Sequence, residues 1–255
     1  MTPTAFFLFG AARSGTNALT WALQASDQIV IKNEDSIDCF DQFTLKDDFA
    51  IEAVLREAAP KPVFFKSFHD TPRAKLLLGL HPGSRAIYSI RQPSDCIGSF
   101  VNEFGKAGAE LWFERFTSAA DERRGLLLHV CRGDLAAAEL AVDRAKFVLY
   151  ELDKSGVSIP NVAACYYLWA HSFAEYIGLF DDGRFLVVDY DAMVSNPQAA
   201  LDRACRHFSI KTIYANADRW FVGRGFGTTI DVAPRLLKQC QAVYEGIKGG
   251  ANRQI

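Results

Sequence analysis

Residues 10–17 combine two glycines, an arginine and three hydroxyl or amide side chains in a pattern that suits an anion. The stretch reads Gly-Ala-Ala-Arg-Ser-Gly-Thr-Asn, and it stands between an apolar run at 5–9 and a helical pattern at 18–23. Two glycines five residues apart let the backbone curl so that successive N–H groups face one anion. The start of the following helix adds its dipole and its own N–H groups. We therefore predict an anion-binding turn that includes Arg13, Ser14, Gly15, Thr16 and Asn17.

The glycine spacing is that of a nucleotide-binding P-loop, but one diagnostic residue is absent. The Lys-Ser/Thr pair that should follow the second glycine is replaced by Thr16-Asn17, and Arg13 lies inside the loop. Ordinary hydrolysis of ATP or GTP is therefore disfavoured.

The elements that must position this turn alternate between short apolar runs and longer helical patterns. Runs rich in aromatic and β-branched residues, typical of strands buried in a parallel sheet, occupy 5–9, 29–31, 63–65, 86–90 and 185–188. One helical stripe, which we interpret as core packing, comprises Val162, Tyr166, Trp169, Phe173, Tyr176 and Ile177. The alternation predicts an α/β fold, a doubly wound parallel sheet flanked by helices, of the P-loop nucleotide-binding type. No linker or repeat divides the chain, so we expect residues 1–255 to form a single domain.

In such sheets ligands bind beyond the carboxyl ends of the strands. The turns to inspect are therefore 10–17, 32–35, 66–70, 91–95 and 189–191. Four of these five turns carry a cation or a carboxylate next to a hydroxyl, amide or imidazole group. An active site is expected at this edge.

Composition excludes several classes of protein. Hydrophobic residues make up 49% and charged residues 23% of the 255, which is ordinary globular usage. The formal charge of −2 argues against a nucleic-acid partner held by a global field, and no apolar stretch approaches the 18 or so residues of a membrane span. The first residues read as a buried strand, not a signal peptide. Six cysteines without a CxxC pair suit isolated thiols, so we expect a cytoplasmic location.

Two segments resemble the cofactor-binding motifs of one family. Residues 9–17 resemble the 5′-phosphosulfate loop of sulfotransferases that use 3′-phosphoadenosine-5′-phosphosulfate (PAPS), typically Pro-Lys/Arg-Ser-Gly-Thr-Thr. Residues 88–100 resemble the 3′-phosphate element, in which a strand ends in Arg, Asp/Asn-Pro follows, and Ser stands eight residues after the Arg. The resemblance implies that Arg91 and Ser99 hold the 3′-phosphate, a role that suits the rigid fork of an arginine.

Two later segments resemble the same family with departures. Residues 184–197 resemble its late strand followed by Tyr-Glu-x-Leu and a downstream Pro, with Asp in place of Glu, which implies that Tyr190 lines the adenosine pocket. Residues 221–228 resemble the loop that folds over the 3′-phosphate, with Arg224 and Gly225 matched and the second cation of that loop absent. The matches run from residue 6 to about 227 in the family order.

The resemblance implies sulfuryl transfer from PAPS to a hydroxyl or amine of a small-molecule or carbohydrate acceptor, by in-line displacement and without a metal. The product nucleotide is 3′-phosphoadenosine-5′-phosphate (PAP). Lys66 is matched to a lysine that bridges the cofactor and the transition state. Residues 105–160 are expected to supply helices or a lid over the acceptor site.

Two residues compete for the role of general base. His69 lies close to the Lys-Thr-His of cytosolic sulfotransferases, with one extra residue after Lys66, and an imidazole suits proton abstraction near neutrality. Glu34 resembles the Glu of carbohydrate and heparan-type sulfotransferases, although a free carboxylate needs desolvation to become a good base. The sequence leaves the choice open, as it does the acceptor, the oligomeric state and the pathway.

Two other functions are alternatives to this one. A P-loop small-molecule kinase would need the missing lysine and a magnesium-binding carboxylate. A catalytically inactive nucleotide-binding module on the same fold would bind nucleotide without turnover.

Overall fold

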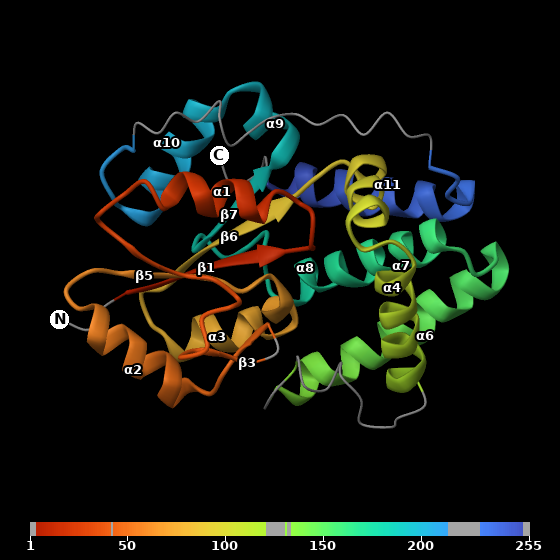
Figure 1. Cartoon of the computed structure of the whole chain (residues 1–255), viewed down its shortest axis with the longest axis horizontal. Helices are drawn as coiled ribbons and strands as arrows, with labels where there is room; N and C mark the ends of the chain where they lie inside the picture. The colour runs from red at the N-terminus through yellow and green to blue at the C-terminus, as the bar shows by residue number, and fades with distance from the viewer. Residues whose placement is uncertain (1–3, 42, 121–130, 132–133, 214–229, 252–255) are drawn as a thin grey trace.

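The centre of the molecule is a five-stranded parallel sheet (Figure 1). The computed structural model describes residues 4–41, 43–120, 131, 134–213 and 230–251. The sheet order is β2-β5-β1-β6-β7, with β1 Ala5–Gly10, β2 Val30–Lys32, β5 Val63–Lys66, β6 Arg85–Ile90 and β7 Phe185–Asp189. A separate antiparallel pair is formed by β3 Phe40–Asp41 and β4 Thr44–Leu45. All five predicted strands and the parallel α/β class are confirmed.

Helices cover both faces of the sheet and form a bundle beyond the carboxyl ends of its strands (Figure 1). On one face lie α1 Thr16–Leu23, α9 Tyr190–Ser195 and α10 Pro197–Phe208. On the other lie α2 Asp48–Ala58, the 3-10 helix η1 Phe68–Arg73, α3 Ala74–Leu80 and α8 Phe173–Tyr176. The bundle comprises α4 Pro93–Ala120, α6 Leu135–Ser155, α7 Ile159–His171 and α11 Pro234–Ala251.

Successive side chains of β1 point to opposite faces of the sheet, so this strand packs against helices on both faces. Phe6 and Leu8 pack in the core under α1 and α10, whereas Phe7 and Phe9 pack in the core against α2 and α3. A strand that is apolar on both sides must be covered on both sides, because each exposed ring would leave apolar area in water. This fixes β1 at the middle of the sheet and therefore places the turn that follows it at the centre of the carboxyl edge.

Two helices differ from what regular periodicity predicts. The aromatic stripe from Val162 to Ile177 does not lie on one helix, because the chain breaks between α7 and α8 at Ser172, whose hydroxyl donates to the carbonyl oxygen of Trp169 at 2.7 Å. The long α4 is kinked at Gly105, whose φ of 51° and ψ of −139° are not helical. Glycine tolerates this positive φ where other residues are strained.

Two further facts bear on the expectations from composition. Among the helices that the structure describes, none is long and apolar enough to cross a membrane. All six cysteines are buried free thiols.

Candidate functional site

Three neighbouring strands bring the predicted site residues to one edge. In the order β5-β1-β6, the central strand leads into the glycine turn, β5 ends at Lys66, and β6 leads directly into Arg91. Parallel strands end at the same edge of a sheet, so these turns are neighbours despite wide separation in sequence. The sequence prediction of a site here is therefore supported by the topology.

The turn after β1 takes backbone conformations that favour glycine. Gly10 has a φ of 140° and Gly15 a φ of 94°, and Arg13 also has a positive φ, of 70°. Gly15 is the N-cap residue of α1, and it has no side chain that could accept a hydrogen bond from the first turn. Thr16 and Asn17 are the first residues of the helix. The unsatisfied N–H groups at a helix start and the helix dipole favour an anion at this point.

Hydroxyl groups from distant elements hold the turn in shape. The amide of Gly10 donates to Thr71 Oγ1 at 3.1 Å, and the amide of Ala12 donates to the Tyr166 hydroxyl at 2.7 Å. The Ser89 hydroxyl donates to the carbonyl oxygen of Ser14 at 2.6 Å. Some amides of the turn are thus occupied by protein acceptors, contrary to the expectation that successive N–H groups face the anion. The N–H groups that can face an anion are therefore those at the start of α1, from Gly15 onward.

The residues predicted to bind the cofactor meet around this turn. Arg13 Nε donates to Ser99 Oγ at 3.0 Å, and Arg91 Nη1 donates to the carbonyl oxygen of Arg13 at 3.3 Å. The Arg91 guanidinium is buried and lies 4.6 Å from the ring centroid of Tyr190. A Cβ added at Gly15 would lie 2.1 Å from a Tyr190 ring carbon, so the ring packs directly on the glycine. Two arginines, a serine and a tyrosine thus line one rim.

Lys66 and Glu34 form a largely buried ion pair between the ends of β5 and β2. Lys66 Nζ contacts Glu34 Oε1, and the lysine side chain is 7% exposed. The second carboxylate oxygen of Glu34 is buried and has no hydrogen-bond partner among the described residues. Lys66 is therefore a buried side chain at the site, not a surface lysine.

His69 lies on η1 beside the same edge and lines a small pocket with Gly10. Its ring lies 4.3 Å from that of Phe68 and 6.0 Å from that of Phe43, measured between centroids. Burial, together with the positive charges of Arg115 and Lys66, lowers the pKa of His69 to about 3. The imidazole is therefore neutral near pH 7, and it is a weaker base than a free histidine.

A buried ion pair fixes η1 against the β3–β4 hairpin. Arg73 Nη2 contacts Asp70 Oδ1 at 2.6 Å, and both side chains are almost fully buried. The other Asp70 oxygen accepts from the amide of Leu45 at 3.0 Å, while Arg73 donates to the Leu45 carbonyl oxygen at 2.8 Å. This network positions His69 from outside the site.

Two residues that shape the site were not predicted from the sequence, and two predicted residues lie outside the part of the chain that the structure describes. Tyr166 was assigned to the core by its helical period, yet its hydroxyl holds the turn and its ring lines the pocket. Thr71 carried no signal, because its contact with Gly10 spans 61 residues. Arg224 and Gly225, predicted to cover the 3′-phosphate, lie outside the described residues.

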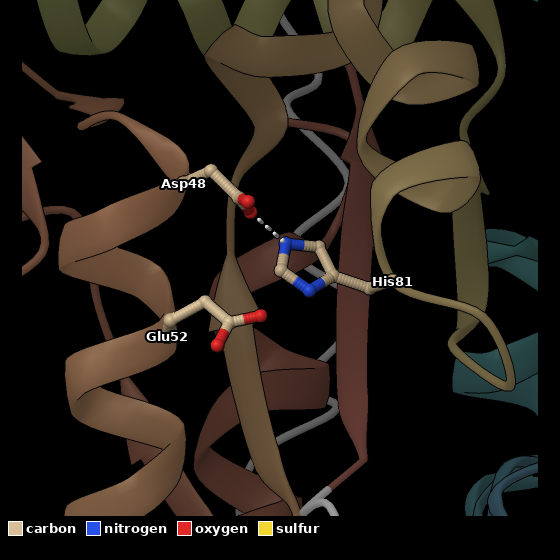
Figure 2. A group of neighbouring side chains, drawn as sticks. All are labelled: Asp48, Glu52 and His81. Atoms are coloured by element: carbon tan, nitrogen blue, oxygen red, sulfur yellow. Dashed lines mark ion pairs between the residues drawn. The ribbon is translucent and has the colours of Figure 1, made fainter.

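A second cluster of ionisable side chains joins α2 to the residue after α3 (Figure 2). His81 Nε2 lies 3.0 Å from Asp48 Oδ1, and Glu52 stands one helical turn further along α2. The ligand atoms of the three residues lie within 4.8 Å of one another, a separation that suits a metal ion, whereas the sequence suggested no metal site. Asp48 is half exposed, and its ion pair with His81 is enough to explain why the two side chains lie close together. We therefore assign this cluster no part in the reaction.

Residues 3–220 match the family model described as Sulfotransferase domain. A sulfotransferase from Alicyclobacillus acidocaldarius shares the fold with a TM-score of 0.54 and 16% identity, over 99% of this chain and 95% of that one. A sulfotransferase domain from the curacin biosynthetic pathway gives a TM-score of 0.50 and 15% identity, over 84% and 76%. No curated protein matches the chain in sequence.

Proposed function

Since the chain belongs to the sulfotransferase domain family, we propose that it transfers a sulfuryl group from PAPS to a hydroxyl group of a small-molecule or carbohydrate acceptor. Membership of the family supports sulfuryl transfer in general. The choice of PAPS rests on one observation: buried Arg91, buried Ser99 and partly exposed Arg13 converge beside a P-loop-like turn that has no lysine.

The donor set fits the two charged ends of PAPS. The start of α1 would face the 5′-phosphosulfate, and the Arg91 guanidinium with the Ser99 hydroxyl would hold the 3′-phosphate, for which an arginine fork is suited. The Tyr190 ring, packed on Gly15, would support the adenosine. Arg224 and Gly225 are proposed to close over the 3′-phosphate.

In the reaction the acceptor oxygen forms a bond to sulfur as the bond from sulfur to the 5′-phosphate oxygen breaks, and PAP leaves. Lys66 would neutralise the charge that grows on that phosphate oxygen, as cations do in phosphoryl transfer. Its ion pair with Glu34 holds the ammonium at the strand end, so little reorganisation is needed during the reaction. The protein thus acts by positioning and by charge.

The acceptor proton goes to a base, for which we propose His69. Its place in the lining of the pocket next to the turn supports this proposal, and its imidazole is neutral near pH 7. The negative charge of bound PAPS would raise the low pKa of His69 toward the useful range. Glu34, with its unpartnered oxygen, is the second candidate.

The direct test follows sulfur-labelled PAPS in the presence of a panel of hydroxylated acceptors. We expect the label to move to at least one acceptor, with one PAP formed for each. Movement of the γ-phosphate of ATP-Mg in place of the sulfuryl group would indicate a kinase. Tight binding of PAP with no transfer to any acceptor would indicate an inactive nucleotide-binding module.

A further inference from the structure

The cluster of Asp48, Glu52 and His81 lies apart from the transfer site (Figure 2). Asp48 and Glu52 stand one turn apart on α2, so both side chains project from the same face of that helix. His81 directly follows α3 and comes shortly before β6, which places it near the amino end of that strand. The proposed transfer site lies at the carboxyl ends of the strands, so this cluster has to be explained separately.

The imidazole of His81 is held in place by the protein core. Its side chain is only 7% exposed, and its ring lies 6.1 Å from that of Phe7 in the central strand, measured between centroids. The amide of His81 donates to the carbonyl oxygen of Leu77 at 3.2 Å, and its carbonyl oxygen accepts from the amide of Ser84 at 3.0 Å. The ring is therefore fixed in position and is more than nine-tenths buried.

The Nε2 atom of this ring is buried and makes no hydrogen bond to any residue that the structure describes. It lies 3.0 Å from Asp48 Oδ1, but this ion-pair contact is not a hydrogen bond. Buried side-chain polar atoms nearly all have a partner, and an ion is one of the groups that satisfy those without one in the protein. The ion pair explains the closeness of two side chains, but it explains neither the unsatisfied nitrogen nor the approach of Glu52.

The three side chains form a donor set that suits a zinc ion. Figure 2 shows both carboxylates directed toward the imidazole, and the ligand atoms lie within 4.8 Å of one another. Small rotations of the Asp48 and Glu52 side chains would bring these atoms to the bond lengths of about 2.0–2.2 Å that Zn²⁺ takes with nitrogen and oxygen. An imidazole favours Zn²⁺ over Mg²⁺ and Ca²⁺, which prefer oxygen ligands. The two carboxylates also balance the two charges of the ion.

We propose that Asp48, Glu52 and His81 bind one Zn²⁺, with water at the remaining position, and that the ion joins α2 to the end of α3. Both helices pack in the same hydrophobic core through Ile51 and Leu77, so the ligands come from elements whose positions are already fixed. A site built in this way does not need the chain to rearrange when the ion binds. The proposal does not depend on sulfuryl transfer, and it assigns the ion a structural role.

The test uses the whole chain, freed of metal by dialysis against a chelator and titrated with Zn²⁺, Mg²⁺ or Ca²⁺ in a calorimeter. We expect one Zn²⁺ per chain, bound at least about tenfold more tightly than Mg²⁺ or Ca²⁺. X-ray absorption of the one-to-one zinc sample should show nitrogen or oxygen ligands at about 2.0–2.2 Å and no sulfur at about 2.3 Å.

Three variants test the assignment of the ligands. His81→Gln and Glu52→Gln should each weaken Zn²⁺ binding by at least about 10- to 100-fold, the loss that follows when even a group that only orients a ligand is changed. Glu57→Gln makes the same change at an exposed position of α2 and should leave the affinity intact. Circular dichroism checks that each variant is folded. Glu52→Gln carries the test alone if His81→Gln, a change at a buried side chain, does not fold.

Four results would overturn the proposal. The first is an unmutated chain that does not bind Zn²⁺, or that binds Mg²⁺ or Ca²⁺ as tightly. The second is unchanged Zn²⁺ affinity in Glu52→Gln. The third is an equal loss in Glu57→Gln, which would indicate general attraction to surface charge. The fourth is sulfur in the coordination shell, which would place the ion on cysteines. Each measurement is made without PAPS or an acceptor, so failure of the proposed sulfuryl transfer would not alter any of them.

Discussion

Replacing Gly15 by alanine should disturb both the backbone of the turn and the ring that packs on it. The φ of 94° lies where L-residues are strained by roughly 1–2 kcal/mol. The new Cβ would lie 2.1 Å from a Tyr190 ring carbon, so the ring must move, and overpacking of this kind adds about 1–3 kcal/mol. We expect Gly15→Ala to lower the free energy of unfolding by about 2–5 kcal/mol in total, within the roughly 5–15 kcal/mol that a folded domain has.

Urea denaturation measures this loss, and two comparisons isolate its causes. Gly83 has a φ of 86° and open space around its Cβ position, so Gly83→Ala should show the backbone part alone, about 1–2 kcal/mol. In a Tyr190→Ala background the ring is gone, and Gly15→Ala should cost no more than Gly83→Ala does. A loss at Gly15 equal to that at Gly83, or one unchanged by Tyr190→Ala, would refute the close packing of ring on glycine.

Three further predictions concern the site and the pH dependence of stability. Arg91→Ala should weaken PAP binding by about 10- to 100-fold in calorimetry but barely affect adenosine-5′-phosphosulfate, which lacks the 3′-phosphate; parallel losses would make Arg91 structural. His69→Ala should lower kcat by about 10²- to 10⁴-fold with PAP affinity unchanged, and the same result at Glu34→Gln, with His69→Ala active, would transfer the role of base. Burial lowers the pKa of His171 to about 3, so the unfolded chain binds its proton first and the free energy of unfolding falls as pH drops below about 6.5. By pH 5 this contribution is about 2 kcal/mol, and urea melts of His171→Gln at pH 8 and pH 5 should show a fall smaller by that amount.

The fold could be predicted because each strand can be identified from its own short stretch of sequence. Phe6 to Phe9 are apolar at every position, which suits a strand covered on both faces, and the glycine turn follows this strand directly. Arg13 and Arg91 follow the ends of neighbouring strands, so their closeness in space could be predicted from the sequence.

The pocket beside the glycine turn could not be predicted in this way. Tyr166 and Trp112 follow the same helical period as ordinary core residues, so periodicity cannot separate packing from pocket lining. The contact between Thr71 and Gly10 depends on how elements distant in the sequence pack. Long-range packing of this kind leaves no spacing signal in the sequence.

The most direct test of the central claim is calorimetric titration of the protein with PAP and, separately, with ATP-Mg. A site built around Arg91, Ser99 and a turn without the P-loop lysine should bind PAP at least about tenfold more tightly than ATP-Mg, a difference of about 1.4 kcal/mol. Binding of ATP-Mg as tight as that of PAP, or tighter, would contradict the account.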